Sequence, residues 1–151
     1  MHISLFLSNF ALRNWKRVIY TPIFGIKKMV NSKNTKKVNI PYEDQRKVLE
    51  EWMDKKKPYL RQNFRIEDLR AALPLNRTYL SRLINNEYHC SFFHFVARYR
   101  VEEAKRLMAT NPNLMLQEVA AQAGFASSTV FGRVFARETG MTPSAWRRTN
   151  K

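Results

Sequence analysis

The chain has 151 residues, which is enough for one ordinary domain or two small helical ones. Hydrophobic residues make up 44% of it, and the presence of one cysteine, Cys90, excludes an internal disulfide. Only four glycines occur, and β-branched residues rarely alternate with polar ones, which argues against an all-β domain. The net charge of +15 favours a polyanionic partner, either a nucleic acid or an anionic membrane surface.

The first 40 residues differ in charge from the rest of the chain. They carry eight of the 27 Lys and Arg residues and no acid, which leaves 19 basic and 12 acidic residues for 41–151. The apolar run at the start lacks a preceding positive charge, as a signal peptide would have, and is too short to span a bilayer. We interpret 1–40 as a basic extension and linker, either partly ordered or the remnant of a missing upstream region. An amphipathic helix lying on a membrane is the alternative.

From Pro41 onward, the apolar periodicity predicts one helix after another, and hence an all-α domain over 41–151. Proline, asparagine, serine and glycine at the expected boundaries indicate where these helices begin and end. With their cap residues, the expected helices are 42–56, 66–73, 76–88, 91–110, 116–123, 127–139 and a short last one that opens at 142–143.

A unit of a short helix, a tight turn and a longer helix occurs twice. The turns correspond at an offset of 50 residues; after one extra residue, Asn76 corresponds to Ser127 and Arg82 to Arg133 at an offset of 51. A capped second helix with a polar outer face is the sequence form of a helix-turn-helix, in which that face enters a major groove. The residues of the longer helices expected in the core are Tyr79, Leu80, Leu83 and Ile84 in the first copy and Val130, Phe131 and Val134 in the second.

The outer face of each longer helix carries residue types that read base edges. Short hydroxyl side chains at a helix N-terminus suit phosphates or base edges, and an arginine one turn further suits the O6 and N7 atoms of guanine. Either arginine alone is more often a plain surface residue, but the repeat favours a function. The candidates are Thr78, Ser81 and Arg82 in the first copy and Ser128, Thr129 and Arg133 in the second. On the long helix, an ordinary solvated face is expected for Arg98, Arg100, Lys105 and Arg106.

The stretch LQEVAAQAGFASSTVFGRVFARETGMTPSAWR resembles the second helix-turn-helix signature of the AraC/XylS-type transcription regulators. Upstream, TYLSRL and SFFHFVARYRVEEAKRLM resemble the first recognition helix and the linking helix of that family, so the resemblance covers roughly residues 43–148. It implies seven helices, with a long helix joining two helix-turn-helix subdomains. It also implies that the two recognition helices enter successive major grooves, about 34 Å apart.

The resemblance implies a sequence-specific regulator of transcription that binds double-stranded DNA, with RNA polymerase as a further partner. By matching position, the family's base contacts fall on the six candidates given above. Phosphate contacts are assigned to Asn76, Arg77, Ser127, Arg137 and Arg147. The sequence departs from the family pattern at Pro74 in the first turn and at His89, where glycine usually follows the recognition helix. Gly132 is unusual because it lies inside a helix.

Other classes of function fit the sequence less well. There is no glycine-rich phosphate loop and no nucleophile–base set, so we predict that the chain is not an enzyme. His89, Cys90 and His94 lie close together, but structural zinc sites usually need four ligands, so no metal or cofactor is predicted. Cys90 and His94 are instead expected to be half-buried. No small-molecule pocket is indicated, and a cytoplasmic location is expected. The rival interpretation is a regulator fragment attached to a membrane through its basic N-terminal segment.

Overall fold

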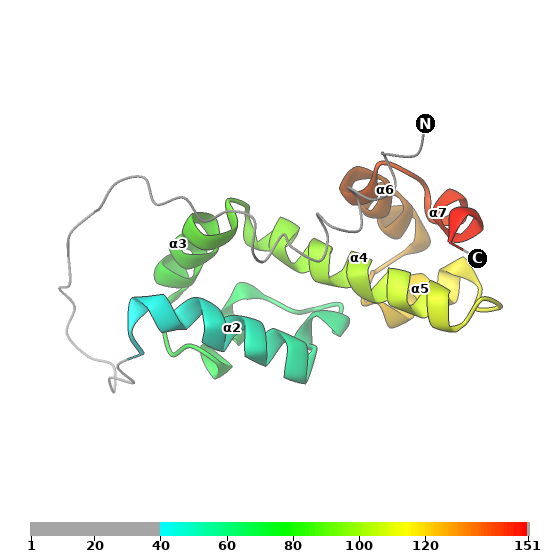
Figure 1. Cartoon of the computed structure of the whole chain (residues 1–151). Helices are drawn as coiled ribbons and strands as arrows, with labels where there is room; N and C mark the ends of the chain where they lie inside the picture. Colours follow the sequence, from blue (N-terminus) through cyan, green and yellow to red (C-terminus); the bar gives the residue numbers. More distant parts are fainter. Residues whose placement is uncertain (1–39, 151) are drawn as a thin grey trace. The chain divides into compact units, whose positions relative to one another are not determined.

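The computed structural model describes residues 40–150, so the expectations for residues 1–39 lie outside the described part of the chain (Figure 1). Within 40–150 the fold is all-α, as predicted. The helices are α2 (Tyr42–Lys56), η1 (Pro58–Leu60), η2 (Ile66–Ala71), α3 (Arg77–Tyr88), α4 (Phe92–Thr110), α5 (Leu116–Gln122), α6 (Ser128–Thr139) and α7 (Pro143–Thr149). Each of the seven expected helices is present, although η2 is a 3₁₀-helix. The short 3₁₀-helix η1 was not predicted.

The two longer helices of the repeat begin and end at the predicted residues. The Oδ1 atom of Asn76 accepts a hydrogen bond from the backbone N–H of Tyr79 at 3.0 Å, and Ser127 Oγ accepts one from Val130 at 3.2 Å. Such caps satisfy backbone donors that have no partner within the helix. At the other ends, His89 and Gly140 adopt left-handed backbone conformations, with φ of 51° and 77°. His89 therefore carries the strain expected of a non-glycine residue there.

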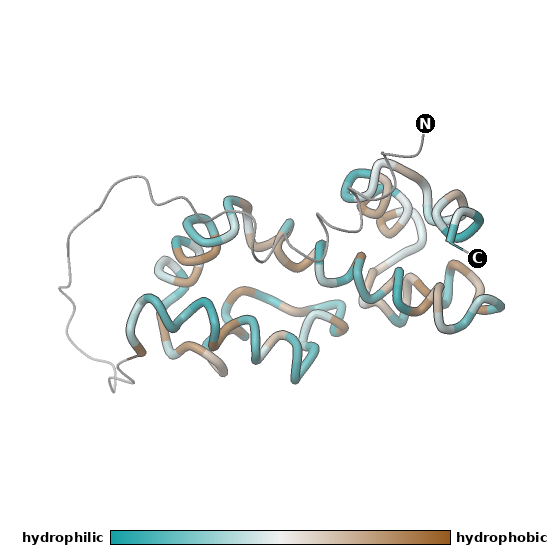
Figure 2. Tube along the Cα trace, in the orientation of Figure 1, coloured by the Kyte–Doolittle hydropathy of each residue, from teal (hydrophilic) through white to brown (hydrophobic). Residues whose placement is uncertain are grey.

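The long helix α4 contributes to two cores. In Figure 1 it runs from the region of α2 and α3 to that of α5, α6 and α7, and in Figure 2 hydrophobic and hydrophilic residues alternate along it. In the first core, the ring of Phe95 packs on that of Tyr88, and Tyr99 packs on Tyr59. The members of the second core are Ala97, Val101, Ala104, Leu107, Met108, Val119, Ala120, Ala123, Phe125, Phe131, Val134 and Phe135. Because α4 belongs to both cores, each unit is anchored to the same helix.

Tyr79 was wrongly predicted to be buried, since 42% of it is exposed. Its predicted companions Leu80, Leu83 and Ile84 are buried, as are Phe131 and Val134 in the second copy. Tyr79 lies at the border between the buried and outer faces of α3. Val130, at the corresponding position of α6, packs only partly against its core. A large phenol ring at this border extends into solvent.

Candidate nucleic-acid interface

The short first helix of each unit begins with the same hydrogen bond. In the first unit, Asp68 Oδ2 accepts from the backbone N–H of Arg65 at 2.9 Å. In the second, Glu118 Oε2 accepts from the N–H of Met115 at 2.8 Å. The two acids are 50 residues apart, the offset at which the turns correspond. The repeat seen in the sequence is thus also a repeat of local structure, from the start of the first helix to the end of the second.

The six predicted base-contacting residues all reach the protein surface. On α3, Thr78 and Arg82 are exposed and Ser81 is half-exposed. They lie within one turn of each other on the face opposite the buried leucines, as the helical period requires. On α6, Ser128, Thr129 and Arg133 are exposed. Each longer helix therefore has one side fixed in a core and another open to a ligand.

Three of the predicted phosphate contacts lie at the N-terminal ends of these helices, where unpaired backbone N–H groups favour anions. Asn76 and Ser127 are the caps described above, and both are exposed. Arg77 Nε lies 3.4 Å from Glu67 Oε1 across an exposed pair. Ion pairs of this kind contribute little to stability, so Arg77 can exchange its partner for a phosphate at small cost.

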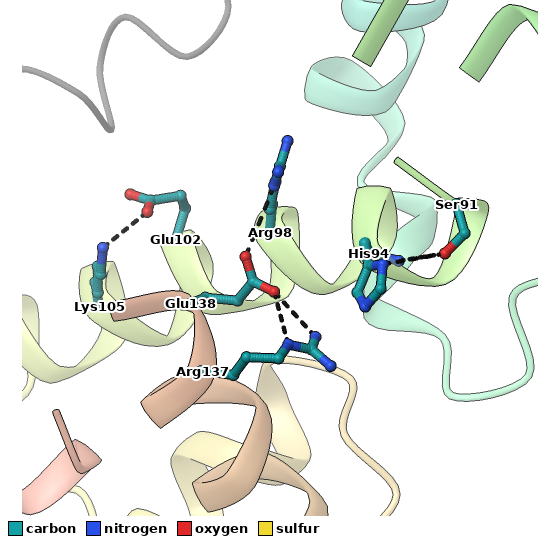
Figure 3. Close-up of polar contacts among 7 residues, drawn as sticks. All are labelled: Ser91, His94, Arg98, Glu102, Lys105, Arg137 and Glu138. Atoms are coloured by element: carbon teal, nitrogen blue, oxygen red, sulfur yellow. Dashed lines mark hydrogen bonds and ion pairs between the residues drawn. The ribbon is translucent and has the colours of Figure 1, made fainter. Parts of the chain in front are cut away.

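Arg137 lies in a cluster between α4 and α6 (Figure 3). Its Nε and Nη2 atoms donate to Glu138 Oε1 at 3.1 and 2.9 Å, and its guanidinium lies 5.6 Å from the ring centre of Phe93. The other oxygen of Glu138 lies 3.7 Å from Arg98 Nε on α4. This cluster links the C-terminal part of α6 to the linking helix. A phosphate contact by Arg137 would therefore compete with Glu138.

Arg147, on α7, is the least accessible of the predicted phosphate contacts. It is half-buried, and its Nε and Nη2 atoms are out of contact with solvent. Neither atom has a hydrogen-bond partner within the described residues. The neighbouring Trp146 packs partly against the second core, with its ring 6.2 Å from that of Phe135.

The second unit meets η1 and α4 at a junction that the sequence did not reveal. Arg100 of α4 donates from Nε to the carbonyl oxygen of Tyr59 at 2.7 Å and from Nη2 to that of Arg61 at 2.8 Å. The guanidinium also lies 5.9 Å from the ring centre of Phe125, in the turn of the second unit. Burial lowers the pKa of Arg100. Arg100 thus contacts the end of η1 and the second turn at once.

The packing at the same junction explains why residue 124 is a glycine. Its φ of +85° is one that L side chains rarely adopt, and a Cβ atom there would lie 2.6 Å from the carbonyl oxygen of Tyr59 and 2.8 Å from that of Leu60. The carbonyl of Phe125 also accepts a hydrogen bond from Gln62 Nε2 at 3.3 Å. The second turn therefore packs directly on η1, and only glycine fits at its closest point.

The prediction of an ordinary solvated face on α4 was wrong for Arg100 and Lys105, whereas Arg106 is exposed as expected. Arg98 and Arg100 make the contacts given above, and Lys105 is buried, with Nζ 2.9 Å from Glu102 Oε1. Arg106 donates to Glu103 at 2.6 and 3.1 Å. Arg98 and Arg100 therefore contact neighbouring elements, whereas Lys105 and Arg106 pair with acidic residues of α4 itself.

Glu103 joins the junction between α2 and η1 to α4. It is buried, and besides Arg106 it accepts a hydrogen bond from Lys57 Nζ at 3.1 Å. The hydrogen bond from Arg106 and the charge of Lys57 hold the pKa of Glu103 below its ordinary value despite burial. Lys57 itself has a left-handed backbone, with φ of 44°, at the end of α2.

Unlike Gly124, Gly132 is not required by the packing or the backbone conformation around it. It lies in the interior of α6, outside the positive-φ glycines, and a Cβ atom there would meet nothing within 4 Å. A glycine in a helix interior costs about 1 kcal/mol relative to alanine.

The remaining sequence candidates lie near the start of α4. Cys90 and His94 are half-buried, as predicted, and burial raises the pKa of the Cys90 thiol. Within residues 40–150, no three or more His, Cys, Asp or Glu side chains are grouped as metal ligands. In the same range, no helix has the length and apolar character needed to cross a membrane.

A family model described as a helix-turn-helix domain matches residues 69–149. Over 53 residues the chain is 45% identical to the HTH-type transcriptional activator RhaR of Salmonella arizonae and of Salmonella paratyphi B. That segment is 35% of this chain but only 18% of each relative.

Two solved structures share the fold. The C-terminal domain of AraT, a response regulator from Geobacillus stearothermophilus, superposes with a TM-score of 0.60 at 25% identity. That match covers 75% of this chain and 88% of the AraT domain. The DNA-binding domain of AdpA, a global transcriptional factor solved with a target DNA, gives a TM-score of 0.58 at 26% identity. It covers 68% of this chain and 91% of the AdpA domain.

Two capped helices on one linking helix, each with an exposed polar face, define a double helix-turn-helix domain of the DNA-binding class. The chain belongs to the helix-turn-helix family of AraC/XylS-type transcription regulators, and its described part has the fold of their C-terminal DNA-binding domain. Its relatives are regulators rather than enzymes.

Proposed function

We propose that this chain is a sequence-specific regulator of transcription that reads two successive major grooves of double-stranded DNA with α3 and α6. The observation that carries the proposal is the repeated unit, because each copy presents a capped helix with an exposed polar face. The names of two relatives agree with it, since RhaR is called a transcriptional activator and the AdpA domain was solved with its target DNA.

In this proposal the base edges are contacted by short polar side chains and one arginine on each helix. Arg82 and Arg133 contribute most, because an arginine can make two hydrogen bonds to one guanine. The base-contacting residues are Thr78, Ser81, Arg82, Ser128, Thr129 and Arg133. The phosphate-contacting residues are Asn76, Arg77, Ser127, Arg137 and Arg147.

The junction of the second turn with η1 and α4 supports the two-groove part of the proposal. Arg100 and Gly124 connect η1, α4 and the second turn through short contacts. A pair of recognition helices held in this way favours two half-sites at one fixed spacing over two independent sites. We further propose that the protein acts in the cytoplasm and contacts RNA polymerase when bound near a promoter.

Selection of bound sequences from a random duplex pool by the full chain, at moderate salt with competitor DNA, tests this function. The expected result is one motif with two parts about one helical turn apart. A single short motif would contradict reading by two helices. No enrichment, with affinity falling steeply as salt rises, would mean that the charge binds any polyanion, and the proposed function would be wrong.

A further inference from the structure

Gly132 lies at a position where neither the backbone conformation nor the surrounding packing requires a glycine. It lies in the middle of α6, which runs from Ser128 to Thr139. Gly124 and Gly140 are the described glycines with positive φ, and Gly132 is not among them. No atom of the described residues, apart from its own turn of helix and chain neighbours, lies within 4 Å of the position its Cβ would take. Alanine would therefore fit and would favour the helix.

The position of Gly132 is on the side of α6 assigned to DNA. It follows Thr129 by three residues and precedes Arg133, and residues three apart are neighbours on a helix surface. At the offset of 51 residues that relates the two units, Gly132 corresponds to Ser81, which carries a side chain on α3. The two recognition helices thus differ at a half-exposed position beside their exposed arginines.

A glycine at an open helical position has a physical reason when another molecule approaches the backbone closely. We infer that Gly132 is the point at which the backbone of α6 comes into van der Waals contact with the major-groove edge of the bases. The inference rests on the proposed function and adds a specificity determinant to it. Glycine has no side-chain donor or acceptor, so this contact distinguishes base pairs by the shape of their major-groove edge and not by hydrogen bonds. It also sets how deeply Thr129 and Arg133 enter the groove.

The inference predicts opposite effects on stability and on binding. Gly132→Ala in the full chain should raise Tm by about 2–4 °C, because alanine favours the helix by about 1 kcal/mol relative to glycine. The same variant should bind the duplex selected by the unchanged protein about tenfold more weakly, a loss comparable to one mismatched base pair. Gly132→Leu should lose more. As a control, Ala109→Leu adds a larger side chain at an exposed position of α4 that has no predicted DNA contact, and its affinity should not change.

The experiment measures Tm by thermal unfolding and affinity on the selected duplex and a scrambled duplex at one salt concentration. Higher Tm with weaker binding to the selected duplex alone supports the inference. Unchanged affinity of Gly132→Ala for the selected duplex would overturn it while leaving the proposed function intact. An equal loss on both duplexes would indicate contact with the phosphate backbone and overturn the groove-edge assignment. Failure of the proposed function shows separately, as the absence of any selected motif for the unchanged protein.

Discussion

Gly124 packs against Tyr59 so closely that a Cβ atom on the glycine would lie 2.6 Å from the tyrosine's carbonyl oxygen. Tyr59 lies in η1, which precedes the first helix-turn-helix unit, and Gly124 lies in the turn of the second. The same carbonyl oxygen accepts the 2.7 Å hydrogen bond from Arg100 Nε. One backbone carbonyl therefore contacts both the linking helix and the second turn. A substitution that displaces this carbonyl should disturb both contacts and lower the stability of the domain.

Gly124→Ala should destabilise the domain by about 2–5 kcal/mol. A left-handed backbone costs a non-glycine residue about 1–2 kcal/mol, and the added methyl group must also displace the backbone of η1. Urea denaturation followed by circular dichroism measures this loss.

Gly140→Ala is the matched control for this prediction. Gly140 also has a positive φ, of 77°, but a Cβ atom there would meet nothing within 4 Å. Its substitution should cost only the backbone term, about 1–2 kcal/mol. If both variants lost the same free energy of unfolding, the backbone of η1 would move aside at no cost, contrary to the close packing at Gly124.

The Arg100 guanidinium should stabilise the domain through its two hydrogen bonds to carbonyl oxygens. Arg100→Met leaves these acceptors without their donor, and we expect a loss of about 1–3 kcal/mol in the free energy of unfolding. Arg100→Lys should recover only part of it, since an ammonium lacks the planar fork that reaches both carbonyls. Arg70→Met, at an exposed position of η2, is the control and should change stability little. A full recovery by lysine would argue against the two-carbonyl geometry.

These contacts mark the boundary of what could be predicted from the sequence. The caps at Asn76 and Ser127 and the end of α6 at Gly140 depend on residues a few positions apart, so local patterns predicted them. Arg100 and its acceptor Tyr59 are 41 residues apart, and no local pattern indicates which charged residue of an amphipathic helix will be covered. Tyr79 was misassigned for a related reason: it lies at the edge of a helical face, where period alone does not decide burial.

Glu103 should make stability depend on pH in the acidic range. Its pKa is lowered in the folded protein from an ordinary value of 4.5, chiefly by the hydrogen bond from Arg106. The unfolded chain therefore binds more protons than the folded one in this range. The stabilisation that ionised Glu103 contributes is complete above the ordinary pKa of a glutamate. It is lost as pH falls through the lower pKa that Glu103 has in the folded protein.

Glu103→Gln tests this expectation. At neutral pH it should cost about 1–3 kcal/mol, because Lys57 and Arg106 lose a charged acceptor. The difference from the unchanged protein should shrink as pH falls below 4.5. Glu51→Gln serves as the control, since its pair with Lys55 is exposed and 3.8 Å long, and it should have little effect at any pH. A difference for Glu103→Gln that stays constant with pH would contradict an ionised Glu103.

Arg133 and Arg137 should affect DNA binding in different ways although they are one turn apart on α6. Arg133 is exposed on the outer face and is assigned to a base, whereas Arg137 is assigned to a phosphate and is paired with Glu138. Arg133→Ala should cost about 1–3 kcal/mol on the selected duplex and relax specificity at one base pair. Arg137→Ala should weaken all sequences alike and lower the salt dependence.

The measurement is the affinity of both variants for the selected duplex, for duplexes with each base pair replaced in turn, and at several salt concentrations. Arg82→Ala provides the comparison on α3, and it should relax a different base pair, in the other half of the motif. If Arg133→Ala instead weakened every duplex equally, Arg133 would be a phosphate contact. The base contacts of the second unit would then have to come from the short side chains of Ser128 and Thr129, which reach less far into the groove.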